Sequence, residues 1–220
     1  MSKSMSPNNL LSLLFLLLPT WTTLFVTTFA YDVSINSTLM FPFNCSVIVK
    51  TCNSLLYHNN GLQEEQIASY YSVNTSQIKP ISHGNKQDYL VSVPCSCKDV
   101  NGTVAYFYDT LYKVQPNDTF FNVSNQIYSG QAWNDGGEQH FVAGEEFPMH
   151  LLCGCVGSES QIVVTYTVQQ GDTLVGISTQ LSAKISDIEN MNRNLIQNPG
   201  FIDVGWVLFV PMENNGTTVP

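Results

Sequence analysis

Residues 166–174 read Tyr-Thr-Val-Gln-Gln-Gly-Asp-Thr-Leu, and residues 112–120, which lie 54 positions earlier, read Tyr-Lys-Val-Gln-Pro-Asn-Asp-Thr-Phe. Five of these nine positions are identical in register, which is more than composition explains. Self-similarity at a fixed spacing indicates a chain that is built from repeated small units. A third, fainter copy lies 110 residues before the last one, with Ile67 matching Ile177, Ser69 matching Thr179 and Ile78 matching Ile188.

The last copy begins with a strand, a turn and a helix. Residues 163–168 are β-branched and aromatic, which favours a strand, and the turn Gln170-Gly171-Asp172 follows it. Leu174, Ile177 and Leu181 then fall on one helical face.

The rest of this copy predicts a second helix and a closing strand. Ser186 and Glu189 have the spacing of a capping box, so we expect the second helix to begin at Ser186. Residues 198–200 read Asn-Pro-Gly and interrupt the chain, and residues 206–210 favour a strand. The predicted order is strand, helix, helix, strand.

The first thirty residues predict a secretory signal peptide. Lys3 precedes the apolar run 10–18, and small residues at Thr28 and Ala30 suit cleavage after Ala30. The alternative is an uncleaved anchor, because apolar character continues to Phe29.

The charge balance excludes one class of ligand. The chain carries a net charge of −9 and has a single arginine, Arg193, so it cannot neutralise a nucleic-acid backbone. The absence of a basic patch also argues against a strongly anionic polymer. No stretch after the leader is apolar over the roughly 18 residues that a membrane span requires, so a membrane attachment would need a segment beyond Pro220.

Six cysteines in a chain with a signal peptide predict a disulfide framework. A zinc site is the alternative, but the spacing is Cys-x-Cys and the histidines are scattered, so we expect no metal and no cofactor. Neighbours in a Cys-x-Cys seldom bond to each other, which excludes Cys95 to Cys97 and Cys153 to Cys155. About ten of the fifteen pairings remain open.

Seven Asn-x-Ser/Thr triplets agree with export and predict a glycoprotein. They begin at Asn36, Asn44, Asn74, Asn101, Asn117, Asn122 and Asn215.

The Gly-Asp-Thr-Leu turn, the helix after it, the asparagine-rich second helix and the closing Val210-Pro211 resemble a LysM module. Three such modules separated by Cys-x-Cys resemble the ectodomains of plant LysM receptor-like kinases, over about residues 45–212. The resemblance implies an α+β fold in which a βααβ third module and two irregular modules form a cloverleaf. It also implies three clamping disulfides, Cys45–Cys97, Cys52–Cys155 and Cys95–Cys153.

The expected division of the chain follows the resemblance. It comprises the signal peptide 1–30, an N-terminal segment 31–44, modules at 45–97, 98–155 and 156–212, and a stalk 213–220 that leads to an absent transmembrane segment.

Two departures from the family pattern matter. Residues 131–140 contain two glycines and no helical periodicity, so we expect the second module to lack its second helix. Lys79-Pro80-Ile81 interrupts the second helix of the first module, and we expect an extended segment there. Irregular modules of this kind are similar to the legume exopolysaccharide receptors more than to chitin receptors.

The sequence predicts no enzyme. Glu64-Glu65 and Glu145-Glu146 are adjacent carboxylates in single segments, whereas glycoside hydrolysis needs two carboxyls that face each other across a cleft. Three modules leave no room for a catalytic domain, although a kinase domain can follow in the full-length gene.

The resemblance places a sugar in a groove between the loop after the first strand and the loop before the last strand. In the third module the implied ligand-binding residues are Gln170, Gly171, Asp172, Thr173, Asn198, Gly200 and Phe201, and in the second module they are Asn117, Asp118 and Thr119. The alternative is that Asp172 and Thr173 only cap the helix and that Phe201 belongs to the core. A glycan on Asn117 would obstruct the second groove.

The function that we expect is a receptor ectodomain on the outer face of the plasma membrane. It would bind a microbial polysaccharide, with exopolysaccharide favoured over chitin or lipochitooligosaccharide, and pair with a co-receptor ectodomain in symbiosis or immunity. The alternatives are a secreted LysM protein that scavenges chitin or peptidoglycan fragments and a wall-anchoring module of a hydrolase.

Overall fold

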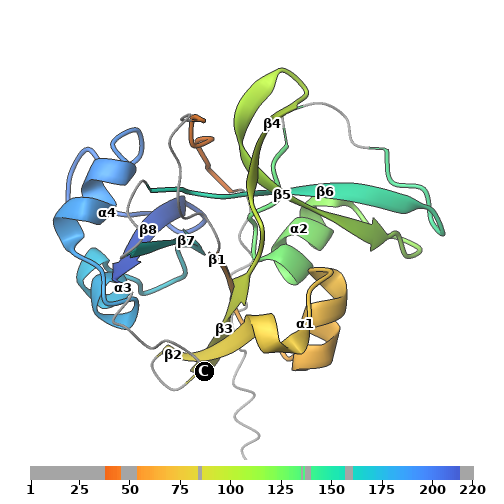
Figure 1. Ribbon diagram of the computed structural model, residues 1–220, viewed down its shortest axis with the longest axis horizontal. Helices are drawn as coiled ribbons and strands as arrows, with labels where there is room; N and C mark the ends of the chain where they lie inside the picture. The colour runs from red at the N-terminus through yellow and green to blue at the C-terminus, as the bar shows by residue number, and fades with distance from the viewer. Residues whose placement is uncertain are drawn as a thin grey trace, which may run out of the picture. The chain divides into compact units, whose positions relative to one another are not determined.

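The computed structural model describes residues 38–45, 54–83, 86–134, 136, 140–156 and 161–213. The signal peptide, Asn36, Cys52 and Asn215 lie outside these ranges. Helices and strands combine in the expected α+β fold (Figure 1). In chain order the elements are β1 (Ser54–Tyr57), α1 (Glu64–Tyr70), η2 (Thr75–Gln77), β2 (Ile78–His83), β3 (Lys86–Ser92), β4 (Ser96–Val100), β5 (Thr103–Lys113), α2 (Phe120–Tyr128), β6 (Glu146–Leu152), β7 (Gln161–Thr167), α3 (Leu174–Gln180), α4 (Ile185–Met191) and β8 (Val207–Glu213). No helix in the described ranges is long and apolar enough to cross a bilayer.

The first and third modules share one sheet. Its strand order is β2-β3-β1-β7-β8, and β1 pairs with β3 in antiparallel fashion. β1 also pairs with β7 in parallel, with Ser54 opposite Val164 and Leu55 opposite Thr165. The sequence did not predict this sharing, which joins two repeats through backbone hydrogen bonds.

The second module contributes a separate sheet of three strands, in the order β4-β5-β6. The long strand β5 pairs with β4 at one end and with β6 at the other, where Tyr112 lies opposite Phe147. The helix α2 directly follows the turn after β5.

The third module has the predicted order of strand, helix, helix and strand, as β7, α3, α4 and β8. Leu174, Ile177 and Leu181 are all buried, as the helical spacing predicts. The predicted capping box is wrong, because α4 begins one residue earlier and Ser186 lies inside its first turn. The amides of Asp187 and Ile188 bond to the Lys184 carbonyl instead, at 3.0 and 3.1 Å.

The start of α4 is fixed by the strand next to it. Ala183 forms an isolated bridge with Met212 of β8, and the Glu213 amide donates to the Ser182 carbonyl at 3.3 Å. The chain therefore turns into the helix directly after this pairing, whatever the side chain at Ser186.

The first and second modules are irregular, as expected. In the first, one 3₁₀ turn replaces the second helix, and β2 runs through Pro80 at the edge of the sheet. In the second, Ala132 pairs with Leu151 of β6, and none of the described residues between α2 and β6 is helical.

Two disulfides join different parts of the chain. Cys45 bonds to Cys97 of β4, and Cys95 bonds to Cys153, which follows β6. These pairs confirm two of the three expected bonds and exclude a bond between Cys95 and Cys97. Cys155 is also disulfide-bonded, but its expected partner Cys52 lies outside the described residues.

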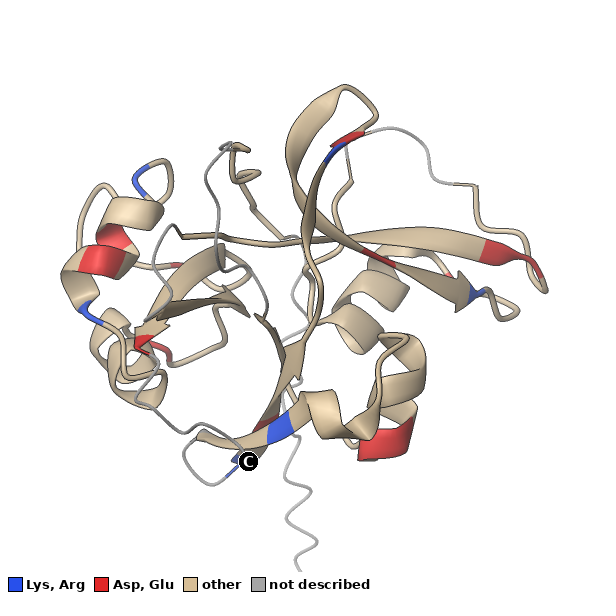
Figure 2. Cartoon of the chain, in the orientation of Figure 1, with Lys and Arg blue, Asp and Glu red and all other residues tan. Residues whose placement is uncertain are grey.

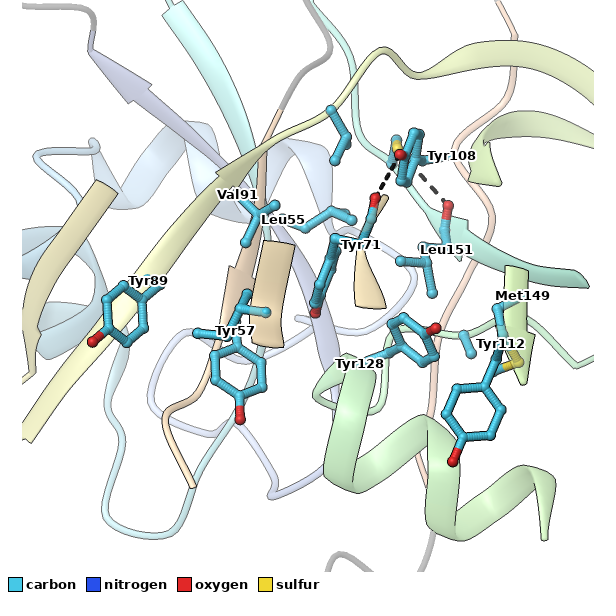
Figure 3. Packing of buried hydrophobic residues seen from close by; sticks show 14 of the residues in the cluster. Leu55, Tyr57, Tyr71, Tyr89, Val91, Tyr108, Tyr112, Tyr128, Met149 and Leu151 are labelled. Atoms are coloured by element: carbon cyan, nitrogen blue, oxygen red, sulfur yellow. Dashed lines mark hydrogen bonds between the residues drawn. The ribbon is translucent and has the colours of Figure 1, made fainter. Parts of the chain in front are cut away.

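Tyrosines fill the core that the first two modules share (Figure 3). The ring of Tyr71 meets the rings of Tyr57 and Tyr128 edge to face, with centroids 6.4 and 5.4 Å apart. Above them, the Tyr108 hydroxyl donates to the Tyr71 carbonyl at 2.6 Å. A single module of this size buries too little apolar surface to be stable alone, and a shared core removes that limit.

Buried side chains also join all three modules at one point. Gln131 of the second module donates from Nε2 to the carbonyls of Leu56 and Thr165, at 2.7 and 3.2 Å. Close by, His58 Nε2 lies 2.8 Å from the Thr167 carbonyl, and its Nδ1 lies 3.0 Å from the Asp88 carboxylate. These bonds fix the modules against one another in addition to the disulfides.

The N-terminal segment 38–45, here called the strap, is part of the folded unit. Leu39 pairs with Trp206 in parallel, through bonds of 3.0 and 2.9 Å to Gly205 and Val207. Further along the strap, the Phe43 carbonyl accepts from the Tyr106 amide at 3.3 Å. The strap thus connects the third module to the sheet of the second.

Candidate carbohydrate-binding site

The turn after β7 is held by one carboxylate. Asp172 Oδ2 accepts from the Tyr166 hydroxyl at 2.8 Å and from the Gln169 amide at 2.7 Å. Thr173 caps α3, because its hydroxyl accepts from the Gly176 amide at 3.0 Å. The Thr173 hydroxyl therefore caps the helix, as the alternative expects, whereas the Asp172 carboxylate holds the turn before it.

The second module repeats this turn bond for bond. Asp118 Oδ2 accepts from the Tyr112 hydroxyl and from the Gln115 amide, both at 2.7 Å. Thr119 caps α2 by accepting from the Asn122 amide at 3.2 Å. The spacing of 54 residues that the sequence shows thus corresponds to one repeated hydrogen-bond network.

The two tyrosines remain protonated donors over the ordinary pH range. Burial raises the pKa of Tyr166, and the negative charge of Asp172 raises it further. Burial likewise raises the pKa of Tyr112, with a further increase from its hydrogen bond to Asp118. Each carboxylate therefore receives a permanent hydroxyl donor.

Backbone pairing brings a second loop toward each turn. In the third module the Gly205 amide donates to the Val168 carbonyl at 2.9 Å, and the Val168 amide donates to Trp206 at 2.8 Å. In the second module Gly144 and Val114 form the equivalent bond at 2.8 Å. In both modules the residues just before the last strand therefore lie beside the start of the turn.

The expected ligand residues of the third module are largely exposed. Gln170, Gly171, Asn198 and Gly200 face solvent, and a Cβ at Gly171 would meet no heavy atom within 4 Å. Asn198 holds its own loop, since its side-chain oxygen accepts from the Gly200 amide at 3.0 Å.

Two apolar side chains are exposed beside these polar groups. Phe201 is 55 % exposed and its ring meets Trp206 edge to face, so the alternative that Phe201 is a core residue is wrong. Val175, in the first turn of α3, is 64 % exposed. Sequence reasoning missed Val175, although its position next to the buried Leu174 places it on the outer side of the helix.

The second module differs at the outward residue of the turn. Asn117 occupies the place of Gly171, and both have a positive φ, of 71° and 87°. Asn117 is exposed and begins an Asn-x-Thr triplet. Asparagine tolerates this conformation better than most residues, so the turn survives the replacement of glycine.

All the described glycosylation triplets begin on the surface. The asparagines Asn44, Asn74, Asn101, Asn117 and Asn122 are exposed. Asn36 and Asn215 remain predictions.

The two carboxylate pairs lie on different elements. Glu64 and Glu65 begin α1, whereas Glu145 and Glu146 lie at the start of β6. Figure 2 shows acidic residues on α1, α4 and β6. Within the described ranges, no cluster of His, Cys, Asp and Glu has a metal-binding arrangement.

Comparison with known proteins supports the LysM-like fold. Residues 166–211 match the LysM domain family. The chain is similar to the crystal structure of the ectodomain of a receptor like kinase (TM-score 0.55, 17 % identity, 78 % of this chain and 96 % of that chain) and to the LYK3 ectodomain (TM-score 0.54, 20 % identity, 76 % and 94 %).

Curated relatives come from Arabidopsis thaliana. LysM domain receptor-like kinase 3 is 26 % identical over 176 residues, and the match covers 79 % of this chain and 26 % of the relative. LysM domain-containing GPI-anchored protein 1 is 26 % identical over 195 residues, with 77 % and 46 % covered. The chain thus spans about a quarter of the receptor kinase and less than half of the GPI-anchored protein.

Proposed function

We propose that this chain is the carbohydrate-binding ectodomain of a cell-surface receptor and that its third module holds the ligand. The LysM-like fold and the similarity to receptor-like kinase ectodomains support the general role. The ligand that we favour is a microbial polysaccharide, with exopolysaccharide ahead of chitin, and a co-receptor ectodomain is the expected protein partner.

One observation carries the choice of module. The two turns share every hydrogen bond described above, yet the outward position is Gly171 in the third module and a glycosylation triplet at Asn117 in the second. A glycan at Asn117 would project over the second groove and exclude a polymer from it. Gly171 leaves the corresponding surface of the third module open.

The chemistry of the third module suits a neutral sugar chain. The exposed amides of Gln170 and Asn198 offer donors and acceptors to hydroxyl groups, while Phe201 and Val175 offer apolar surface to a ring face. Such shallow contact supports micromolar affinity, about −8 kcal/mol.

The test transfers the feature of the second module to the third. Gly171→Asn creates an Asn-Asp-Thr triplet in the third turn, so it installs a glycan where the backbone already has a positive φ. Gly171→Asp is the matched control, because it adds a side chain of the same size without a glycan. We expect binding to an exopolysaccharide panel to fall at least about tenfold for glycosylated Gly171→Asn, a change of about 1.4 kcal/mol.

Enzymatic deglycosylation of Gly171→Asn should restore binding to the level of Gly171→Asp. Interferometry with immobilised protein measures both steps. Undiminished binding by the glycosylated variant would show that the ligand does not bind to the third module. Failure of every microbial polysaccharide to bind would contradict the proposed function.

A second role is favoured by the GPI-anchored relatives. Their sequence identity to this chain is comparable to that of the receptor kinase. In this second role the chain would belong to a surface-tethered or secreted protein that captures chitin or peptidoglycan fragments. A wall-anchoring module of a hydrolase is the remaining alternative. Sequencing the transcript downstream of Pro220 distinguishes a kinase, a lipid-anchor signal and a hydrolase domain.

A further inference from the structure

A pocket of about 270 Å³ lies between the strap and the end of α4. Its lining includes Phe43, Leu195, Val207 and Phe209, of which the last three are buried. The lining also includes exposed residues from both sides, namely Phe41, Asn44, Asn190, Arg193 and Asn194. None of the residues that line this pocket belongs to the ligand-binding set expected for the third module.

The lining has an unusual composition for a protein of net charge −9. It contains no carboxylate, and Arg193 is its one charged residue. Asn190 and Asn194 supply exposed amides, Arg193 donates to the Asn190 side-chain oxygen at 2.8 Å, and Phe41, which is 40 % exposed, supplies an aromatic face. Amides, a guanidinium and an aromatic face suit a neutral sugar that carries hydroxyl and acetamido groups.

Both walls of the pocket are fixed by other interactions. On the α4 side, the Asn192 side chain donates to the carbonyls of Ile188 and Phe209, at 2.7 and 2.8 Å, and accepts from the Phe209 amide at 2.8 Å. On the other side, the strap is held by its pairing with Trp206 and by the Cys45–Cys97 disulfide. The pocket is therefore preformed and loses little conformational entropy when it is filled.

Asn44 of the lining begins the triplet Asn44-Cys45-Ser46. None of the other described triplets begins at a residue of this lining. We propose that the pocket seats the first N-acetylhexosamine residues of an N-linked glycan that Asn44 of the same chain carries. The proposal is independent of the groove and of its ligand.

The covalent link favours this occupant over a free sugar. A group on a short tether is present at an effective concentration in the millimolar range, so even weak contacts keep it bound. A seated glycan would touch the strap and the α4 side together, so it would stabilise the folded state as a bound ligand does. The glycan would act as a clamp that holds the strap on the third module.

The experiment removes the Asn44 glycan in two ways. Asn44→Gln deletes the attachment residue, and Ser46→Ala removes the acceptor triplet while it keeps Asn44. Asn122→Gln is the matched control, because Asn122 is exposed on α2 and outside the lining. We expect the melting temperature to fall by about 2–4 °C for both first variants and to stay within about 1 °C for the control.

Two further measurements distinguish binding of the first sugars in the pocket from other effects of the glycan on stability. Trimming folded wild-type protein to a single N-acetylglucosamine should retain most of the stabilisation, because the pocket holds only the first sugars. Phe41→Ala should lower the melting temperature more in glycosylated protein than in the Asn44→Gln background.

Three outcomes would each overturn the proposal. The first is an unoccupied Asn44 in mass spectrometry of the secreted protein. The second is an equal melting temperature for Asn44→Gln, Ser46→Ala and Asn122→Gln. The third is a strictly additive effect of Phe41→Ala and Asn44→Gln on the melting temperature.

Discussion

The second and third modules have the same turn and different surfaces. Asp118 and Asp172 accept the same pair of hydrogen bonds, from a buried tyrosine six residues earlier and from an amide three residues earlier. The outward residue differs, as Asn117 in one and Gly171 in the other. Positions that face inward are constrained by the turn, whereas the outward position is free to carry a glycan or to leave a groove open.

The modules diverge further after their first helix. The third module continues into α4, which packs against β8. After its first helix the second module instead has Gln131, whose side chain donates hydrogen bonds to the first and third modules. The lost helix is thus replaced by contacts between modules, so the second module depends on its neighbours more than the third does.

The largest expected effect follows from this dependence. Gln131→Glu keeps the shape of a fully buried side chain but replaces its donor with an acceptor that faces two carbonyls. We expect the free energy of unfolding at pH 7 to fall by about 3–5 kcal/mol, because a buried charge is left uncompensated. Urea unfolding measures the loss.

The pH dependence of that variant has a defined sign. Burial raises the folded-state pKa of the new carboxyl, so stability is greatest below its unfolded pKa and falls as the pH rises through the folded pKa. Gln131→Met, which lacks both the charge and the donor, should lose less and show no such pH dependence. Equal losses for the two variants at all pH values would contradict the explanation.

The shared turn predicts matched effects in the two modules. Asp118→Ala and Asp172→Ala each leave a buried tyrosine hydroxyl and a turn amide without their acceptor. We expect each variant to lose about 2 kcal/mol in chemical denaturation. If Asp172→Ala lowered the free energy of unfolding and Asp118→Ala did not change it, only the turn of the third module would contribute to stability.

A smaller effect is expected at the tyrosine core. The Tyr71 hydroxyl is fully buried and has no hydrogen-bond partner among the described residues, so Tyr71→Phe should be neutral or stabilising by up to about 1 kcal/mol. Tyr166→Phe is the comparison, since its hydroxyl donates to Asp172 and its removal should destabilise. Thermal melts at pH 7 measure both variants.

The same core predicts alkaline sensitivity. Burial raises the pKa of Tyr57 to about 12 and raises that of Tyr71 well above its ordinary value. Groups with a raised folded-state pKa contribute stability below an unfolded pKa of about 10, and that stability is lost as the pH rises further. Stability measured from pH 9 to 12 should therefore decline, less steeply in Tyr71→Phe, and a flat profile would contradict this assignment.

The smallest effect concerns the outward residue itself. Asn117→Gly gives the second turn the residue of the third, in a conformation that glycine adopts readily. We expect a change within about 0.5 kcal/mol. If the glycan closes the second groove, the variant should also gain binding to chitin oligomers. Deglycosylated wild-type protein should show the same gain, because it lacks the same glycan.

Features that depend on short spacing could be predicted from the amino-acid sequence. The turn network joins residues within one stretch of about nine positions, so two aligned copies predict it directly. The buried face of α3 follows from helical spacing, and a glycine-rich stretch predicts the irregular second module. The resemblance supplied the disulfide pairing, of which Cys45–Cys97 and Cys95–Cys153 are confirmed.

Features that depend on distant partners became visible only in the folded chain. The parallel pairing of β1 with β7, the docking of the strap and the bonds of Gln131 each join residues far apart in sequence, and no local pattern encodes a partner of that kind. The start of α4 was misplaced because pairing between Ala183 and Met212 overrides the local capping signal at Ser186. Phe201 is exposed for the same reason, since whether an apolar side chain is buried depends on what packs over its loop.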